Sequence, residues 1–240
     1  MAGPLRVPGR LGSSLAECGY VLQVALDYTS LWDAVALASR IGVWRGLALE
    51  VGTPLLKAYG ARDSVAALRG VAGGEAPVVV DTKTADASDV EADIVASAGG
   101  DAFTVVAAAH EVTLKQASDA AGTRGLAVYG DLVVSRDPLG DAKRAVEAGV
   151  HIVLLHLGLD VQRALGVTAS SRVDLVRRMS SEIDATIAVA GGVKPREAGA
   201  LASAGASIIV IGGAITGSHD PRGEVERALE SLRGAGFRCR

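Results

Sequence analysis

The chain has 240 residues, of which 49% are hydrophobic, 21% charged and 3% aromatic, and its net charge is -3. The high apolar share and the near-balanced charge exclude intrinsic disorder, and the charge offers no basic surface for nucleic acid or an anionic membrane. The first apolar run, at residues 20–26, contains Gln23 and is shorter than the roughly 18 residues of a membrane span, so we expect a soluble cytoplasmic protein.

The amino-terminal segment differs in composition from the rest of the chain. Residues 1–18 are rich in Pro, Gly, Ser and Arg, which predicts a flexible arm ahead of a single domain at residues 19–240. Cys18 and Cys239 lie near opposite ends of the sequence, with no CxxC spacing and no histidine at a metal-ligand interval. We therefore expect two free thiols in a reducing cytosol.

Short aliphatic runs recur from residue 21 onward, and most of them end in a polar residue or lead into glycine. Near-continuous Val, Ile and Leu are typical of strands buried on both faces, which occur in parallel sheets. The predicted strands cover residues 21–27, 46–50, 77–81, 102–106, 126–131, 151–156, 185–190 and 206–211.

The segments between the runs have helical spacing. Residues 31–38 and 142–148 place Leu, Ala and Val three and four positions apart, as in a helix with one apolar face. Eight strand–helix units of about 25 residues predict an α/β protein, a single (β/α)8 TIM barrel. An open doubly wound sheet is the alternative, but no GxGxxG follows the first run.

Active sites of such barrels form at the carboxyl ends of the strands, so the residue that ends each run is a candidate. Several of these residues are ionisable, and they would converge on one opening. They are Asp27, Glu50, Asp81, Asp131 and His156, with Lys83 and Asp86 directly after the third run. Close carboxylates cannot all ionise without a cation, which favours a hard divalent ion such as Mg2+, with Glu50 and Asp81 as its ligands.

The seventh and eighth runs lead into glycine pairs. Gly191 and Gly192 follow the seventh run, and Gly212 and Gly213 follow the eighth. Glycine lets backbone N–H groups approach an anion closely, and the loops after these two strands commonly bind phosphate in barrels. The pattern predicts a phosphorylated small molecule as the ligand.

The segment 81–86, Asp-Thr-Lys-Thr-Ala-Asp, matches the pattern D-x-K-x-x-D. It is accompanied by Ala-Leu-Asp at 25–27, Glu-Val-Gly-Thr-Pro at 50–54, Val-Ala-Gly-Gly at 189–192 and Gly-Ala-Ile-Thr-Gly at 213–217. Over residues 21–230 the chain resembles the orotidine 5′-phosphate decarboxylase superfamily. Within it, the similarity is to the branch containing 3-hexulose-6-phosphate synthase and 3-keto-L-gulonate-6-phosphate decarboxylase.

The resemblance implies a role for each matching residue. Glu50 and Asp81 would bind Mg2+, Lys83 would lie near an enediolate oxygen, and Asp86 would reach the site of a second subunit in a homodimer. The resemblance also implies that Asp27 binds substrate hydroxyls and that Gly192, Gly212 and Gly213 hold the phosphate.

Four positions distinguish the two activities of the branch, and none has the residue typical of the decarboxylases. The residues here are Asp131, Leu159, Ala190 and Gly213. The resemblance therefore implies Mg2+-dependent aldol addition of formaldehyde to D-ribulose 5-phosphate, with His156 and Asp131 moving the proton. Decarboxylation of 3-keto-L-gulonate 6-phosphate is one alternative, and a non-catalytic phosphosugar-binding barrel is another.

Overall fold

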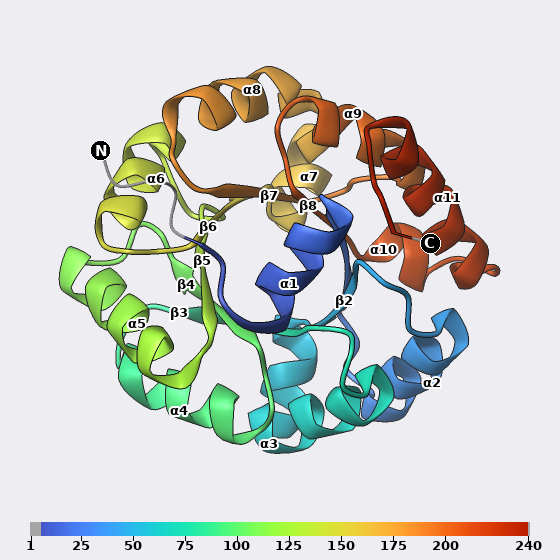
Figure 1. Cartoon of the computed structure of the whole chain (residues 1–240), viewed down its shortest axis with the longest axis horizontal. Coiled ribbons are helices and arrows are strands. Elements are labelled where there is room, and N and C mark those ends of the chain that lie inside the picture. The colour runs from blue at the N-terminus through green and yellow to red at the C-terminus, as the bar shows by residue number, and fades with distance from the viewer. Residues whose placement is uncertain (1–5, 240) are drawn as a thin grey trace.

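The structure is a computed structural model that describes residues 6–239, and its centre is a closed barrel of eight parallel strands in sequence order. Figure 1 looks along the barrel, with helices surrounding the strands. The predicted (β/α)8 barrel is confirmed, and the open sheet is excluded. The strands are β1 (Val21–Leu26), β2 (Leu47–Val51), β3 (Val78–Thr84), β4 (Ala102–Val106), β5 (Ala127–Asp131), β6 (Ile152–His156), β7 (Thr186–Ala190) and β8 (Ile208–Ile211).

The helices begin where side chains or prolines favour a helix start. Ser30, Asp137 and Asp220 each accept a hydrogen bond from a backbone N–H of the first turn, and proline follows both aspartates. The helices are α1 (Gly9–Cys18), α2 (Leu31–Ile41), α3 (Thr53–Ala72), α4 (Ser88–Ser97), α5 (Glu111–Arg124), α6 (Pro138–Glu147), α7 (Leu159–Leu165), α8 (Val173–Glu182), α9 (Ala198–Ser203), α10 (Gly213–Thr216) and α11 (Pro221–Gly234). Short 3-10 helices, η1 (Ala169–Arg172) and η2 (Pro195–Glu197), precede α8 and α9.

The hydrophobic core has two parts, because successive strand residues point to opposite faces. Outward-facing Val, Ile and Leu pack against the surrounding helices. The inward-facing residues form a smaller cluster inside the barrel, and it contains many alanines. Its strand members are Val21, Ala25, Ala48, Val79, Ala102, Ala127, Tyr129, Ile152, Leu154, Ala188, Ala190, Ile208 and Val210.

The prediction of a flexible arm is wrong for residues 9–18, which form α1. This helix lies across the barrel axis in Figure 1, and its Leu11 is fully buried in the interior cluster. Arg10 fixes the helix by donating to Asp101 Oδ1 (2.8 Å) and to the carbonyl of Gly74 (2.9 Å). α1 therefore closes the amino-terminal end of the barrel. Residues 1–5, also part of the predicted arm, lie outside the described residues.

The prediction of free thiols is also wrong, because Cys18 and Cys239 form a disulfide. The closed barrel brings the segment after α11 back to β1, so residues 221 positions apart in the sequence become neighbours. The backbone N–H of Arg238 donates to the carbonyl of Cys18 (2.9 Å), and its guanidinium donates to the carbonyls of Ala16 and Glu17. The carboxyl-terminal segment is thus joined to the end of α1.

Within residues 6–239, no helix has the length and apolar character needed to span a membrane.

Candidate active site

The polar residues at the strand ends share one position in the strand pattern. Asp27, Glu50, Asp81, Asp131 and His156 each come two residues after an inward-facing member of the interior cluster. Because side chains alternate between faces with a period of two, each of these residues is the next inward-facing side chain on its strand. Hydrogen bonds and charge interactions among them place them together at the carboxyl-terminal opening of the barrel.

Asp81 is the most extensively hydrogen-bonded carboxylate of the group. It accepts bonds from the hydroxyls of Thr53 (2.7 Å) and Thr104 (2.9 Å), and it forms an ion pair with Lys83. Burial opposes ionisation of Asp81, but the Lys83 ammonium and the two hydroxyls outweigh it and lower the pKa of Asp81. Asp81 is therefore held as a carboxylate.

Lys83 lies between two carboxylates. Its Nζ pairs with Asp81 and lies 3.6 Å from Asp131 Oδ2. Burial favours the neutral amine, but the charges of Asp81 and Asp131 outweigh it and raise the pKa of Lys83. The site thus contains an ammonium group that stays charged and can stabilise developing negative charge on a ligand.

The backbone of Lys83 has an uncommon conformation, with a φ of 48°. The β3–β4 pairing shifts register between Val80 and Thr84, so Lys83 lies in an irregular part of the strand. Its N–H donates to the hydroxyl of Thr104 (2.8 Å), which itself donates to Asp81. Non-glycine residues in this region are strained, and such strain is concentrated at functional sites.

Asp131 and His156 form a pair at the ends of β5 and β6. His156 Nδ1 lies 3.1 Å from both carboxylate oxygens of Asp131. Asp131 is fully buried, whereas the side chain of His156 is 20% exposed. With Nδ1–H donating to Asp131, the Nε2 atom of His156 is the ring nitrogen that can accept a proton from a ligand. This arrangement is suited to general acid–base chemistry.

Glu50 has the most perturbed acidity of the group. Burial, followed by the charges of Asp81 and Asp27, raises the pKa of Glu50 to about 8. A cation near these carboxylates would reverse the effect, because it favours their charged forms. The hard oxygen ligands of Glu50 and Asp81 therefore fit a Mg2+ ion.

Among residues 6–239, no three His, Cys, Asp or Glu side chains form a ready-made metal cluster. Mg2+ usually keeps several waters and binds through one or two carboxylates together with substrate oxygens. A site with two protein ligands is compatible with that preference.

Asp27 is close to two glycines at neighbouring strand ends. A Cβ on Gly52 would lie 2.1 Å from Asp27 Oδ1, and one on Gly212 would lie 3.4 Å from Oδ2. The side chain is accessible from the opening, yet protein atoms surround much of it. This partial desolvation, with the charge of Asp81, raises the pKa of Asp27. The Asp27 carboxylate therefore occupies space that a side chain at position 52 would fill.

The glycine pair after β7 is held by the segment that follows β6. Gly191 and Gly192 both have positive φ (112° and 71°). A Cβ on Gly191 would lie 2.3 Å from the carbonyl oxygen of Leu157, and one on Gly192 would lie 2.6 Å from Oε1 of Gln162. Only glycine fits this turn, which begins directly after the buried Ala190.

The glycines after β8 differ from this pair. Gly212 precedes the short helix α10, which begins at Gly213. A Cβ on Gly213 would meet open space. The two glycine pairs lie at the ends of the adjacent strands β7 and β8, where the absence of side chains leaves the backbone accessible.

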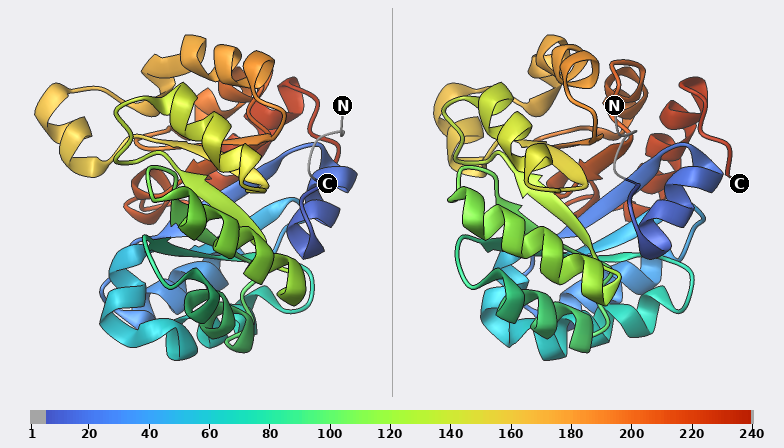
Figure 2. Two further views of the ribbon diagram at one scale, coloured as in Figure 1. Left: turned by 90° about the vertical axis from the view of Figure 1, so that its left-hand side faces the viewer. Right: turned by 60° about the vertical axis from the view of Figure 1, so that its left-hand side comes forward.

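Two sequence candidates lie away from this cluster. Asp86 is exposed in the loop between β3 and α4. Leu159 begins α7, in which no residue is buried and Leu159 and Leu165 are exposed. Figure 2 shows α7 standing out from the barrel at the end opposite α1.

Four residues of the site were not predicted: Thr53, Thr104, Gln23 and Tyr129. Thr53 belongs to the Glu-Val-Gly-Thr segment, and Thr104 occupies the inward position in the middle of β4. Gln23 and Tyr129 are hydrogen-bonded to each other inside the barrel, below Glu50. For Thr104, Gln23 and Tyr129 the signal was the side-chain period of two along a strand, whereas Thr53 lies at the start of α3 and had no such signal.

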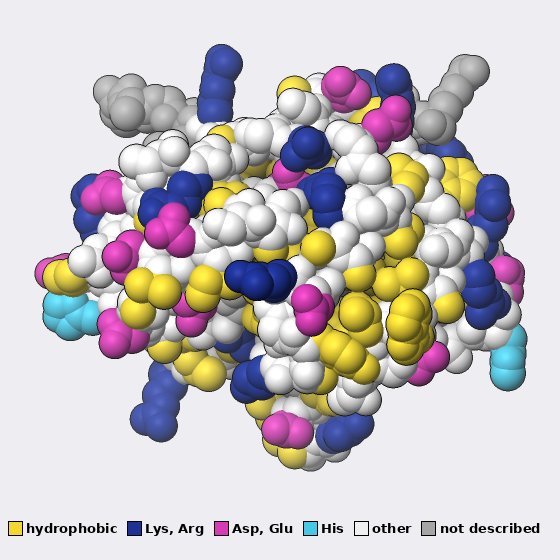
Figure 3. All heavy atoms as spheres, turned by 90° about the horizontal axis from the view of Figure 1, so that it is seen from below, with side chains coloured by type: hydrophobic (Ala, Val, Ile, Leu, Met, Phe, Trp, Pro, Cys, Tyr) yellow, Lys and Arg dark blue, Asp and Glu magenta, His cyan; other side chains and the backbone are white. Residues whose placement is uncertain are grey.

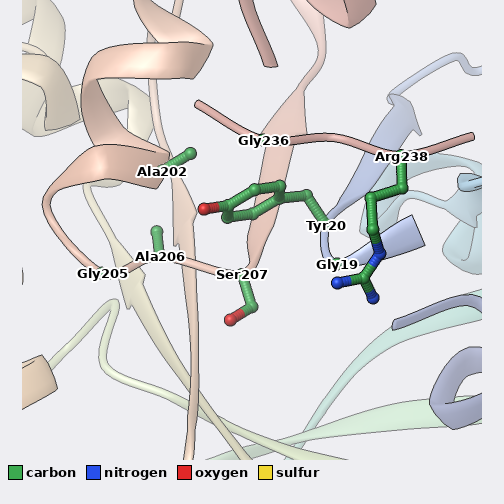
Figure 4. A pocket seen from close by; sticks show the side chains of 8 residues that line it. All are labelled: Gly19, Tyr20, Ala202, Gly205, Ala206, Ser207, Gly236 and Arg238. Atoms are coloured by element: carbon green, nitrogen blue, oxygen red, sulfur yellow. The ribbon is translucent and has the colours of Figure 1, made fainter. Parts of the chain in front are cut away.

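The other end of the barrel has a pocket of ≈ 310 Å³ between the starts of β1 and β8. Figure 4 shows it lined by Tyr20, Ser207 and Arg238, among others. It is separated from the ionisable cluster by the interior core, so it is not part of the candidate active site.

Comparison with known proteins agrees with this geometry. Residues 20–228 match the model of the orotidine 5'-phosphate decarboxylase / HUMPS family. A 3-hexulose-6-phosphate synthase from Methylomonas aminofaciens is 37% identical over 199 residues, which are 83% of this chain and 92% of that protein. One from Mycobacterium gastri is 35% identical, covering 89% of this chain and 98% of that protein.

A solved structure described as 3-hexulose-6-phosphate synthase has a TM-score of 0.79 and 32% identity, covering 88% of this chain and 99% of that one. The similarity thus extends over the whole barrel, including every strand end that carries an ionisable residue. The chain belongs to the orotidine 5'-phosphate decarboxylase / HUMPS family.

Proposed function

We propose that the protein catalyses the Mg2+-dependent aldol addition of formaldehyde to D-ribulose 5-phosphate, giving D-arabino-3-hexulose 6-phosphate, and the reverse cleavage. The observation that carries the proposal is the chain of contacts from Asp81 through Lys83 and Asp131 to His156. This chain of contacts combines the Lys83 ammonium with the His156 imidazole, which the Asp131 carboxylate supports. The two synthases compared above align with most of this protein.

His156 begins the reaction by removing the proton from C1 of the pentulose phosphate through Nε2. Asp131 accepts the Nδ1–H bond and stabilises the imidazolium that forms. The electron pair moves to the carbonyl oxygen at C2, producing an enediolate whose negative charge the Lys83 ammonium stabilises. A Mg2+ ion held by Glu50 and Asp81 would supply further positive charge at this place.

The enediolate carbon C1 then attacks the carbon of formaldehyde and forms the new C–C bond. The oxygen of formaldehyde becomes an alkoxide, and His156 returns its proton to it. Asp27 binds hydroxyls of the sugar, and the backbone after β7 and β8, at Gly191, Gly192, Gly212 and Gly213, holds the phosphate. Ala190 leaves room beside them.

Decarboxylation of a 3-keto sugar-acid phosphate is the closest alternative. It needs a partner for the substrate carboxylate, for which arginine is the best suited side chain. Leu159 is an exposed apolar residue on α7, and Gly213 has no side chain. These two positions therefore favour the aldol reaction, and release of CO2 from the sugar-acid phosphate is the measurement that separates the alternatives.

The reaction can be tested by NMR with ribulose 5-phosphate, Mg2+ and 13C-formaldehyde. We expect labelled hexulose phosphate with Mg2+ and none with EDTA. If no product forms, exchange of the C1 proton in D2O shows whether the enediolate step occurs. A protein that binds the phosphosugar but catalyses neither reaction would be a non-catalytic binding barrel, and the proposal would be wrong.

A homodimer in which Asp86 reaches the partner's site is part of the proposal. Asp86 is exposed, and the helix that follows it, α4, carries exposed Val90 and Ile94 one turn apart. Figure 3 shows the side of the molecule where α3 and α4 lie, with several hydrophobic side chains at its surface. An apolar face beside an exposed acidic residue is compatible with a subunit contact that carries Asp86 to a neighbour.

A further inference from the structure

A chain of polar side chains crosses the interior of the barrel beneath Glu50. The hydroxyl of Tyr129, on β5, donates to Oε1 of Gln23 (2.8 Å), and Nε2 of Gln23, on β1, donates to Oε2 of Glu50 (2.6 Å). Tyr129 is fully buried and Gln23 is 1% exposed. The chain links three strands and ends on a carboxylate to which the proposed function gives a metal.

Small inward-facing residues in the barrel interior leave room for these polar side chains. Ala25, Ala48, Ala102, Ala127 and Ala188 are inward-facing neighbours in the same cluster. Their small side chains leave space for the large ring of Tyr129, in a position where barrels are usually filled by branched aliphatic residues. A polar group in such a core is destabilising unless it is hydrogen-bonded, and here Gln23 bonds both Tyr129 and Glu50.

The direction of the hydrogen bonds is determined by the chemistry of the two ends. When a bound cation holds Glu50 as a carboxylate, Glu50 only accepts, so the NH2 group of Gln23 must face Glu50 and its oxygen must face Tyr129. Burial, with the charge of Glu50, raises the pKa of Tyr129 well above its usual value, so its hydroxyl remains a donor. Without that donor, the amide oxygen would be buried without a partner, and the amide could rotate its oxygen toward Glu50.

We propose that Gln23 and Tyr129 are positioning residues that fix Glu50 in one orientation, with Oε2 bound to the amide and Oε1 left as the oxygen that binds the divalent cation. Partners of this kind behind a metal ligand orient it and change metal affinity by about 10- to 100-fold when removed. The inference rests on the metal site of the proposed function. It goes beyond that function by adding two residues that touch neither substrate nor metal.

The test is Mn2+ binding, measured by EPR on the full chain without sugar or formaldehyde. We expect Tyr129→Phe to weaken Mn2+ binding about 10-fold and to recover much of its turnover at saturating metal. Tyr20→Phe is the matched control, because its hydroxyl donates to the carbonyl of Ala235 (3.1 Å) near the pocket in Figure 4. It removes one hydroxyl of the same kind and should leave Mn2+ affinity unchanged.

A second variant, Gln23→Leu, removes the donor to Glu50 directly. Since Tyr129 acts through Gln23, the double variant should bind Mn2+ as weakly as Gln23→Leu alone. Unchanged Mn2+ affinity in Tyr129→Phe or in Gln23→Leu would overturn the inference, as would a wild-type protein that binds no Mn2+. Because these measurements contain no substrate, failure of the aldol reaction with intact Mn2+ binding would refute the proposed function alone.

Discussion

Replacing Asp131 by Asn tests the proton-transfer step with little change in side-chain size. The amide oxygen of Asn can still accept the bonds from His156 Nδ1 and from the backbone N–H of Val133, which donates to Asp131 Oδ1 (2.9 Å). The new NH2 group then takes the place of Oδ2, which lies 3.6 Å from the Lys83 ammonium. The NH2 group of Asn and the Lys83 ammonium, both hydrogen-bond donors, then face each other. The negative charge that stabilises the His156 imidazolium is also lost.

The expected size of the effect follows from the bond that changes. A hydrogen bond to a charged group contributes about 1.5–3 kcal/mol, and each 1.36 kcal/mol changes a rate by a factor of ten. Asp131→Asn should therefore slow proton removal by about 10- to 150-fold. The assay is exchange of the C1 proton of ribulose 5-phosphate in D2O, followed by NMR without formaldehyde, so that the second substrate plays no part.

Asp101→Asn is the matched control for loss of a buried carboxylate. Asp101 is 6% exposed, and it pairs with Arg10 and Arg69 at the other end of the barrel. This variant should lower the free energy of unfolding and leave the exchange rate unchanged. If Asp131→Asn exchanged the proton at the wild-type rate, the proposed support of His156 by Asp131 would be wrong. Equal slowing in both variants would assign the effect to stability.

Three further changes test other parts of the structure. Gly192→Ala should raise the KM for the phosphosugar and lower the free energy of unfolding by about 1–3 kcal/mol, because φ is 71° and the new Cβ would lie 2.6 Å from Gln162 Oε1. The control is Gly125→Ala, where φ is 69° and the Cβ would meet open space; it should lower the free energy of unfolding without changing the KM. If the two alanine variants had the same KM, Gly192 would not be part of the phosphate site. Cys18→Ser should lower the free energy of unfolding in urea by about 2–4 kcal/mol, and dithiothreitol should have that effect on the wild type but none on the variant. If dithiothreitol left the wild type unchanged, the disulfide would contribute nothing. Val90→Glu, on the exposed face of α4, should convert a dimer to monomers and reduce turnover. Light scattering measures the first effect and steady-state kinetics the second. A fully active monomer would refute the role given to Asp86.

The barrel could be predicted because its signal is local. Buried parallel strands require continuous aliphatic runs, and the side-chain period of two places each terminal polar residue on the inward face. Glu50 and Asp81, for example, follow Ala48 and Val79 by two positions, and both inner residues belong to the interior cluster. The fold and the meeting of the acidic residues therefore follow from the same pattern.

The features that were missed depend on tertiary contacts. α1 contains Gly9 and Gly12 and follows Pro8, so its composition resembles a loop, and it is stabilised by burial of Leu11. A Cβ on Gly12 would lie 1.8 Å from the carbonyl oxygen of Val7, so this glycine is required by a close approach that composition cannot reveal. The disulfide depends on closure of the barrel, which no local pattern encodes.

The same distinction explains the polar residues of the site. Gln23 interrupts an aliphatic run, and Tyr129 replaces an aliphatic residue in another, so each looks like a weak point of its strand. In the structure each satisfies the other, and Glu50 completes the set. A polar residue inside an otherwise apolar strand is therefore informative when a second one occupies the same inward level of a neighbouring or opposing strand.

The charge of the site connects its architecture to its chemistry. Asp27, Glu50, Asp81 and Asp131 share one opening with Lys83, and burial together with the repulsion between carboxylates raises the pKa of Asp27 and brings the pKa of Glu50 to about 8. A site selected for stability alone would not gather these carboxylates, since like charges in a partly buried space are destabilising. A reaction that develops negative charge on a substrate needs concentrated positive charge, and carboxylates are what hold a divalent cation in place. The excess of acidic groups is thus best understood as the means of binding the cation that the proposed chemistry requires.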